Sequence, residues 1–133
     1  MKKLGISLFL FLITSTIHAQ YVVDSYYQPR SVKEIIVEER AKVSLFEKYK
    51  DKAYYHLDKG EYIMFLYYSD QALKMGYYSA KLYYDRSVAY EAIHEYSKAK
   101  RWYKKALRKG YSPAEYALTQ CKTNQREWKK FHK

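Results

Sequence analysis

An internal repeat of about 34 residues constrains the fold of this chain more than any other feature of its sequence. Shifting the sequence by one period, so that Tyr49 meets Tyr83, superposes nine identical pairs without a gap. The pairs are Tyr49 and Tyr83, Asp51 and Asp85, Glu61 and Glu95, Tyr62 and Tyr96, Ala72 and Ala106, Leu73 and Leu107, Gly76 and Gly110, Tyr77 and Tyr111, and Ala80 and Ala114. A fixed period of this length predicts a repeated supersecondary unit, in which each copy buries its apolar face against its neighbour.

The residues of the repeat favour a helical hairpin. Ala53 and Ser87 are small where a first helix must let its partner approach closely. Gly76 and Gly110 follow the second helix, where a left-handed residue commonly ends a helix. The whole chain of 133 residues has only 4 Gly and 2 Pro, too few turn residues for a sandwich or a barrel. The sequence therefore predicts an all-α fold.

The period and these small and apolar positions resemble the tetratricopeptide repeat family over residues 46–116. The resemblance implies one repeat at about 46–79 and a second at 80–113, and the second also resembles the related SEL-like repeats around 98–110. Both are degenerate. The departures are Tyr77 and Tyr111 in place of the usual proline, Lys52 and Arg86 in place of a large apolar residue, and Phe65 in place of a small one. The implied fold is a right-handed α-solenoid of antiparallel helical hairpins.

Two hairpins seldom bury enough surface alone, so helical caps are expected on both sides. Ser31 to Glu34 and Ser112 to Glu115 both have the capping-box pattern, the second with a proline in its first turn. They predict a helix over 32–58 and a capping helix over 113–127, within one domain over 31–127 that ends in a basic tail, 128–133. The helix expected at 61–75 is apolar on every side, so either the upstream part of the long helix or a partner or second copy should cover it.

The first 19 residues have the pattern of a secretory signal peptide. Lys2 and Lys3 precede an apolar run from Leu4 to Ile13, and small residues lead to a cleavage site after Ala19. The site resembles signal peptides of Bacteroidota, which implies export to a periplasm. Cleavage would lower the net charge from +11 to +9. The product, with a flexible leader at 20–30, should be basic and lack a transmembrane helix. Its charge suits acidic proteins or an anionic envelope surface, and export weighs against nucleic acid.

Residues for catalysis or metal binding are scarce. The mature chain keeps His56, His94 and His132, none with a second His or Cys at helical spacing, and no nucleophile or phosphate-loop motif occurs. We therefore expect no enzyme, cofactor or metal site. Cys121, the single cysteine, is either a small buried hydrophobe or a reactive or intermolecular thiol.

Two surfaces could bind a partner. In tetratricopeptide arrays the first helices line a concave groove, and the resemblance implies that the groove residues here are Lys50, Tyr54, Lys81, Tyr84, Val88 and Glu91. The second surface is basic. It comprises Lys98, Arg101, Lys104, Lys105, Arg108 and Lys109, followed by Lys122, Arg126, Lys129, Lys130 and Lys133.

These surfaces give two functional hypotheses. The leading one is an exported periplasmic scaffold that binds a protein or peptide in the groove, since tyrosine combines a rigid ring with a hydroxyl. The alternative is a binder of anionic envelope glycan or lipid at the basic surface, peripheral to the outer membrane. Trp128 and Phe131 lie among the tail lysines and would suit weak membrane contact.

Overall fold

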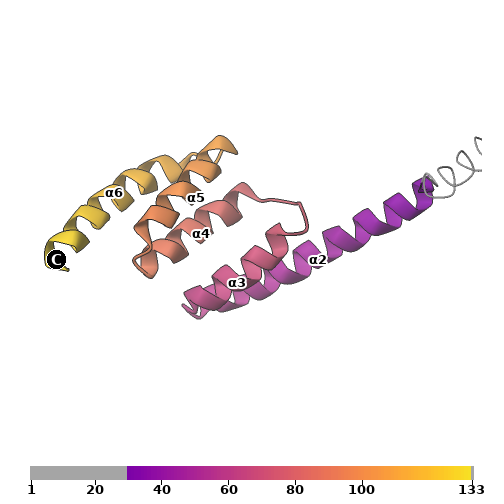
Figure 1. Cartoon of the computed structure of the whole chain (residues 1–133), viewed down its shortest axis with the longest axis horizontal. Helices are drawn as coiled ribbons and strands as arrows, with labels where there is room; N and C mark the ends of the chain where they lie inside the picture. Colours follow the sequence, from indigo (N-terminus) through magenta and orange to yellow (C-terminus); the bar gives the residue numbers. More distant parts are fainter. Residues whose placement is uncertain (1–29, 133) are drawn as a thin grey trace, which may run out of the picture. The chain divides into compact units, whose positions relative to one another are not determined.

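The computed structural model describes residues 30–132, which form five α-helices and no strand (Figure 1). The helices are α2 (Val32–Asp58), α3 (Tyr62–Leu73), α4 (Ala80–Ala92), α5 (Tyr96–Arg108) and α6 (Pro113–Phe131). The all-α prediction is confirmed, and the predicted range of the long first helix matches α2. The predicted signal peptide (1–19) and nearly all of the predicted leader (20–30) lie outside the described residues.

The described residues divide between two units, one ending at Val37 and one beginning at Glu38. In the first unit, the predicted capping box starts α2. The backbone N–H of Glu34 donates to Ser31 Oγ over 3.2 Å, and the N–H of Ser31 donates to Glu34 Oε2 over 3.0 Å. These two bonds satisfy amides that a helix start would otherwise leave without acceptors.

Consecutive helices pack side by side in the second unit, where α3 lies against α2 and α4, α4 against α5, and α5 against α6 (Figure 1). Two apolar clusters form the core. The first joins α2, α3 and α4 and consists of Phe46, Ala53, Phe65, Leu66, Ala72, Leu82 and Ala89. The second joins α5 and α6 and consists of Tyr96, Ala99, Tyr103, Ala106, Ala114, Leu118 and Cys121.

Equivalent positions of the repeat have equivalent roles in the core. Ala53 and Ser87 are both fully buried, as are Ala72 and Ala106, which confirms that small residues lie where helices approach closely. Tyr77 explains one departure from the family pattern. Its ring lies 5.9 Å from that of Phe46, and its hydroxyl donates to Glu39 Oε2 over 2.6 Å, so this tyrosine packs against α2.

The turns also repeat. Gly76 and Gly110 have φ of +87° and +85°, the left-handed conformation predicted for them. Gly60 has φ +72°, and His94, at the equivalent position of the second repeat, adopts φ +61°. The turn at this position is thus left-handed in both repeats, and the second repeat adopts it with a histidine in place of glycine.

We expect Gly110→Ala to lower the free energy of unfolding by about 1–2 kcal/mol, because a Cβ is costly in the left-handed region. Apart from its chain neighbours, no described residue has an atom within 4 Å of a Cβ at this position, so backbone strain alone should set the loss. Gly110→Asn should lose less, since asparagine tolerates this conformation better. Urea denaturation measures both variants, and an unchanged midpoint for Gly110→Ala would show that the turn is not held left-handed in solution.

The structure corrects the prediction at the start of α6. Ser112 precedes the helix, but its side chain makes no capping hydrogen bond to the described residues. Its backbone is already helical, with φ −57° and ψ −33°. The N–H groups of Ala114 and Glu115 donate instead to the backbone oxygens of Tyr111 and Ser112, so a tight backbone turn replaces the predicted side-chain cap.

The structure also places the end of α6 beyond the predicted end at residue 127. The helix continues to Phe131, so the predicted tail at 128–133 begins as helix. Trp128 accounts for the extension, because its indole stacks on the rings of His94 and His132, with centroids 5.7 Å and 4.4 Å away.

The described residues leave one face of α3 exposed. Ile63 is 70% exposed, and Met64 and Tyr67 beside it are exposed as well. Val43 and Leu45, in the upstream turns of α2, are also exposed and do not cover α3. We expected the upstream part of the long helix to bury this face. For the turns of α2 that follow Glu38, this expectation is wrong.

Candidate binding surfaces

Two predicted groove residues on different helices meet at a buried carboxylate. The hydroxyl of Tyr54 on α2 donates to Asp85 Oδ2 on α4 over 2.7 Å, and Lys81 Nζ donates to the same oxygen over 2.7 Å. Lys81 Nζ also lies 5.1 Å from the centre of the Tyr54 ring. Asp85 is only 8% exposed, and its carboxylate is stabilised by the charge of Lys81 and by the hydrogen bond from the neutral Tyr54 hydroxyl.

The electrostatics of this cluster keep the tyrosine protonated. Burial raises the pKa of Tyr54, and the hydrogen bond to Asp85 raises it further. The hydroxyl therefore acts as a donor to Asp85 throughout the physiological range of pH. Its donated bond fixes the ring, which is half-buried and packs 6.0 Å from the ring of Phe65.

Lys50 lies one helical turn before Tyr54 on α2. Its ammonium group pairs with Glu47 on the same helix and lies 5.3 Å from the ring centre of Phe46. Both contacts are within α2, and Lys50 keeps part of its surface in solvent. We call Lys50, Tyr54, Lys81 and Asp85 the α2–α4 surface.

The other three predicted groove residues lie toward α5 and α6. The ring of Tyr84 lies 5.6 Å from Tyr103 and 5.0 Å from Tyr111, and Val88 packs against the second core cluster. Glu91 accepts a hydrogen bond of 3.0 Å from the Tyr103 hydroxyl and one of 2.6 Å from Asn124 Nδ2. All three predicted residues are half-buried, so their contacts mainly join α4 to its neighbours.

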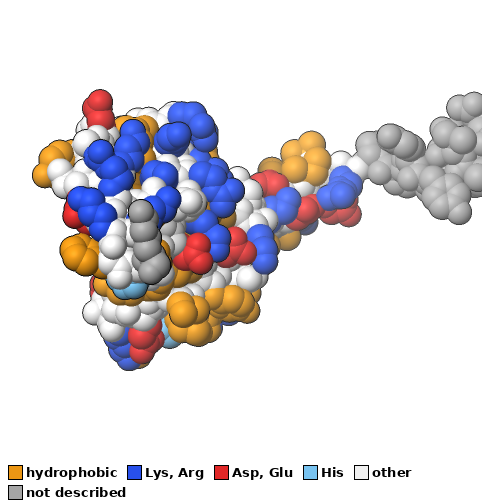
Figure 2. Space-filling view, turned by 60° about the vertical axis from the view of Figure 1, so that its left-hand side comes forward, with side chains coloured by type: hydrophobic (Ala, Val, Ile, Leu, Met, Phe, Trp, Pro, Cys, Tyr) orange, Lys and Arg blue, Asp and Glu red, His pale blue; other side chains and the backbone are white. Residues whose placement is uncertain are grey.

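The basic surface follows the outer side of α5. Tyr96, Ala99, Tyr103 and Ala106 of this helix are buried, which leaves its cationic residues exposed. Figure 2 shows Lys and Arg side chains spread over one face of the molecule. Several rest on aromatic rings, as Lys105 does on Trp102 at 4.0 Å and Lys109 on Tyr78 at 4.1 Å.

The tail presents a different surface from the one expected. Trp128 is half-buried between two histidine rings, so its indole is already packed against the protein. Phe131 is exposed, as are Lys129 and Lys130. Of the two aromatic residues proposed for membrane contact, the structure leaves only Phe131 free of such packing within the described residues.

Arg86 had no predicted role beyond its departure from the tetratricopeptide pattern. The structure buries its side chain between α3, α4 and α5, at 2% exposure. The tetratricopeptide pattern has a large apolar residue at this position. A cation in its place was the sequence signal that could have indicated a buried charge at Arg86. Lys52, its counterpart in the first repeat, is exposed.

Cys121 is fully buried, in agreement with its interpretation as a small buried hydrophobe. Burial raises the pKa of its thiol to about 12, with a further contribution from Glu91, so the thiolate is scarce at neutral pH. Within residues 30–132, no group of three or more His, Cys, Asp or Glu side chains could hold a metal ion. In the same residues, no helix combines the length and the apolar character needed to cross a membrane.

Comparisons of the chain with protein-family models, with curated proteins and with solved structures gave no match.

Proposed function

We propose that this chain is a small exported scaffold of the tetratricopeptide type, which binds an extended peptide segment of a protein partner at the α2–α4 surface. The repeating geometry supports this assignment. The second helices of the two hairpins begin at Tyr62 and Tyr96, which are one repeat period apart, and left-handed residues recur at 60 and 94 and at 76 and 110. A right-handed solenoid of two hairpins between helical caps is the arrangement that these repeats favour.

The fixed tyrosine at the α2–α4 surface carries the functional proposal. Its hydroxyl is held by Asp85, so the ring gives up little conformational freedom when a peptide packs on it. Lys81 lies over the same ring, and its side chain is 59% exposed. A rigid ring beside a solvent-exposed cation suits a peptide that offers an apolar group and a carboxylate close together.

The two lysines of this surface favour an acidic peptide, although each is already paired with one carboxylate, Lys50 with Glu47 and Lys81 with Asp85. Lys50 and Lys81 are both exposed to solvent at least in part, whereas Asp85 is buried beneath the Tyr54 hydroxyl. A carboxylate on the peptide would therefore meet two ammonium groups before it met Asp85. Recognition without catalysis, cofactor or metal is the proposed activity, in the periplasm if residues 1–19 direct export.

A selected peptide tests this function. We expect acidic extended peptides to be enriched from a displayed peptide library, and the double variant K50E/K81E to bind them at least tenfold more weakly, equivalent to about 1.4 kcal/mol. The matched control K48E/K104E makes the same charge change at two exposed lysines outside the α2–α4 surface and should retain binding. Calorimetric titration measures each affinity.

Three outcomes would contradict the proposal. A selection that enriches no peptide would remove its basis, and equal losses in the two double variants would indicate attraction by net charge alone. Binding that survives K50E/K81E but is lost when the basic surface is neutralised would favour the anionic glycan or lipid.

A further inference from the structure

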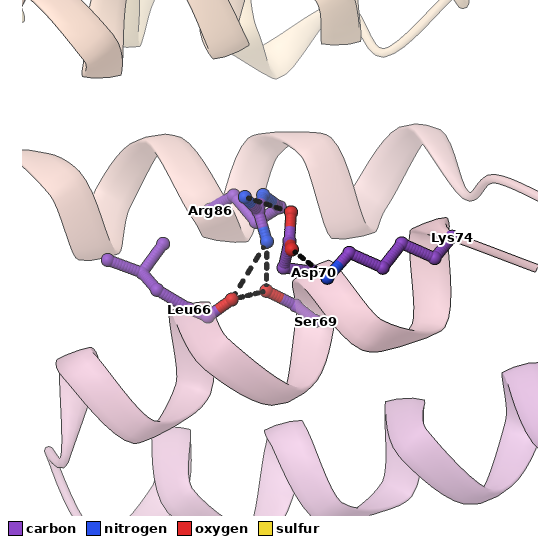
Figure 3. A network of polar contacts seen from close by, with 5 residues as sticks. All are labelled: Leu66, Ser69, Asp70, Lys74 and Arg86. Carbon is purple, nitrogen blue, oxygen red and sulfur yellow. Dashed lines mark hydrogen bonds and ion pairs between the residues drawn. The ribbon is translucent and has the colours of Figure 1, made fainter.

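Arg86 is a buried cation whose charge is only partly compensated. Its Nη1 donates to the backbone oxygen of Leu66 over 3.0 Å and to Ser69 Oγ, both on α3 (Figure 3). The nearest carboxylate, Asp70, lies 3.7 Å from Nη2, beyond hydrogen-bond distance. Asp70 is also half-exposed and pairs with Lys74 at 3.3 Å. One shared and solvated carboxylate is a weak partner for a guanidinium removed from water.

The remaining polar atom of this side chain has no acceptor. Arg86 Nε is buried and makes no hydrogen bond with any of residues 30–132. The Trp102 ring lies 4.3 Å from the centre of the guanidinium, and the Tyr90 ring lies 5.8 Å from it. Aromatic faces attract a cation, and the Tyr90 hydroxyl also interacts with the guanidinium, but neither residue gives Nε an acceptor. The site therefore has a charge that is only partly compensated and a donor that no described residue satisfies.

Arg86 forms part of the wall of a pocket of about 280 Å³. The lining residues are Asp70, Arg86, Tyr90, Lys98, Arg101, Trp102 and Lys105. Lys98 is paired at 3.3 Å with Glu95, which is exposed beside the pocket. Four cationic side chains thus face two carboxylates, Asp70 and Glu95, and Asp70 is shared with Lys74, so at least two positive charges are uncompensated.

We propose that this pocket between α3, α4 and α5 binds a phosphate group, as free phosphate or as the phosphomonoester of a small molecule or lipid headgroup. A phosphomonoester carries about −1.5 to −2 charges at neutral pH and offers three strong acceptor oxygens. That charge balances the two uncompensated cations, and the oxygens match the donors of Arg86, Arg101 and Lys105. The volume lies at or below the small end of ligand pockets, which suits one such group.

This site goes beyond the peptide-binding function, because its lining residues and those of the α2–α4 surface have no member in common. It is also more specific than charge attraction along the basic surface. Lys104 and Arg108 are exposed on the same helix but do not line this pocket. A diffuse attraction would involve them as strongly as Arg101 and Lys105, whereas a built site would not.

The test follows the indole N–H resonance of Trp102 while inorganic phosphate or phenyl phosphate is added to the ¹⁵N-labelled chain at constant ionic strength. We expect saturable shifts with both ligands. The variant R101Q/K105Q should weaken binding at least tenfold, whereas the matched control R108Q/K104Q, with the same loss of charge, should change it less than about twofold. D70N should strengthen binding, because it removes a negative charge from the pocket wall.

Each outcome decides for or against the site. Absence of a saturable shift, equal losses in the two double variants, or equal binding of acetate would overturn the proposal. Vesicles of phosphatidylcholine with and without phosphatidic acid then identify the source of the phosphate. If the chain binds vesicles only when they contain phosphatidic acid, and R101Q/K105Q abolishes this binding, the phosphate belongs to a lipid headgroup. If the chain binds phenyl phosphate but not these vesicles, the phosphate belongs to a small soluble molecule.

Discussion

Removal of residues 112–133 will leave a chain that no longer unfolds cooperatively. The second core cluster consists of two faces, and α6 supplies one of them through Ala114, Leu118 and Cys121. Without α6, the buried side chains of Tyr96 and Tyr103 on α5 would meet water. A small domain has only about 5–15 kcal/mol of stability in total, and losing three of the seven buried residues of one core cluster should remove most of it.

Thermal unfolding followed by circular dichroism, with binding of an apolar dye, measures this effect. The truncated chain should lose its sharp transition and bind the dye. Deleting only residues 129–133 is the control, since the described residues of that segment are exposed, and it should keep the cooperative transition. If the chain lacking 112–133 melts as sharply and at the same temperature as the whole chain, α6 is not a structural cap.

Phe65→Ala is expected to lower the free energy of unfolding by about 3–5 kcal/mol. Phe65 has no exposed surface, and its ring packs 6.0 Å from that of Tyr54 in the first core cluster. Truncation to alanine removes the burial of the ring and leaves a cavity that the surrounding helices can fill only in part. The same variant should also weaken peptide binding, because Tyr54 would lose the ring that supports it.

Ile63→Ala is the matched control for this variant, on the same helix. Ile63 is 70% exposed, so its truncation should change stability by less than about 0.5 kcal/mol. Urea denaturation at equilibrium gives both values. Similar losses for the two variants would mean that α3 presents a different face to α2 and α4 in solution.

The repeat period accounts for how much of the fold could be predicted. It located the hairpins because Gly76 and Gly110 end them and because Ala53 and Ser87 lie at close helix contacts. At such positions the backbone conformation or the space available restricts which residue types fit, so the sequence shows them directly. The cap at Ser112 was mispredicted because its sequence pattern fits two backbone conformations. Only the three-dimensional path of the preceding turn selects the one in which the side chain makes no cap.

The candidate sites were less predictable, since they depend on contacts between distant residues. The resemblance to tetratricopeptide repeats implied a common groove for Tyr54 and Lys81, but their meeting at Asp85 depends on how α2 lies against α4. Tyr84 was predicted by the same rule, and packing against Tyr103 and Tyr111 uses much of its ring. Of the six predicted groove residues, three lie at the α2–α4 surface and three at the contacts of α4 with its neighbours. No local sequence pattern distinguishes these two groups.

Isotope-filtered nuclear Overhauser spectroscopy on the ¹³C-labelled chain with an unlabelled selected peptide tests the proposed function most directly. It detects which side chains lie in close contact with the bound peptide. Our account predicts contacts from the peptide to the ring protons of Tyr54 and to the side chain of Lys81. Contacts confined to the lysines and arginines of α5, with none to Tyr54, would contradict it.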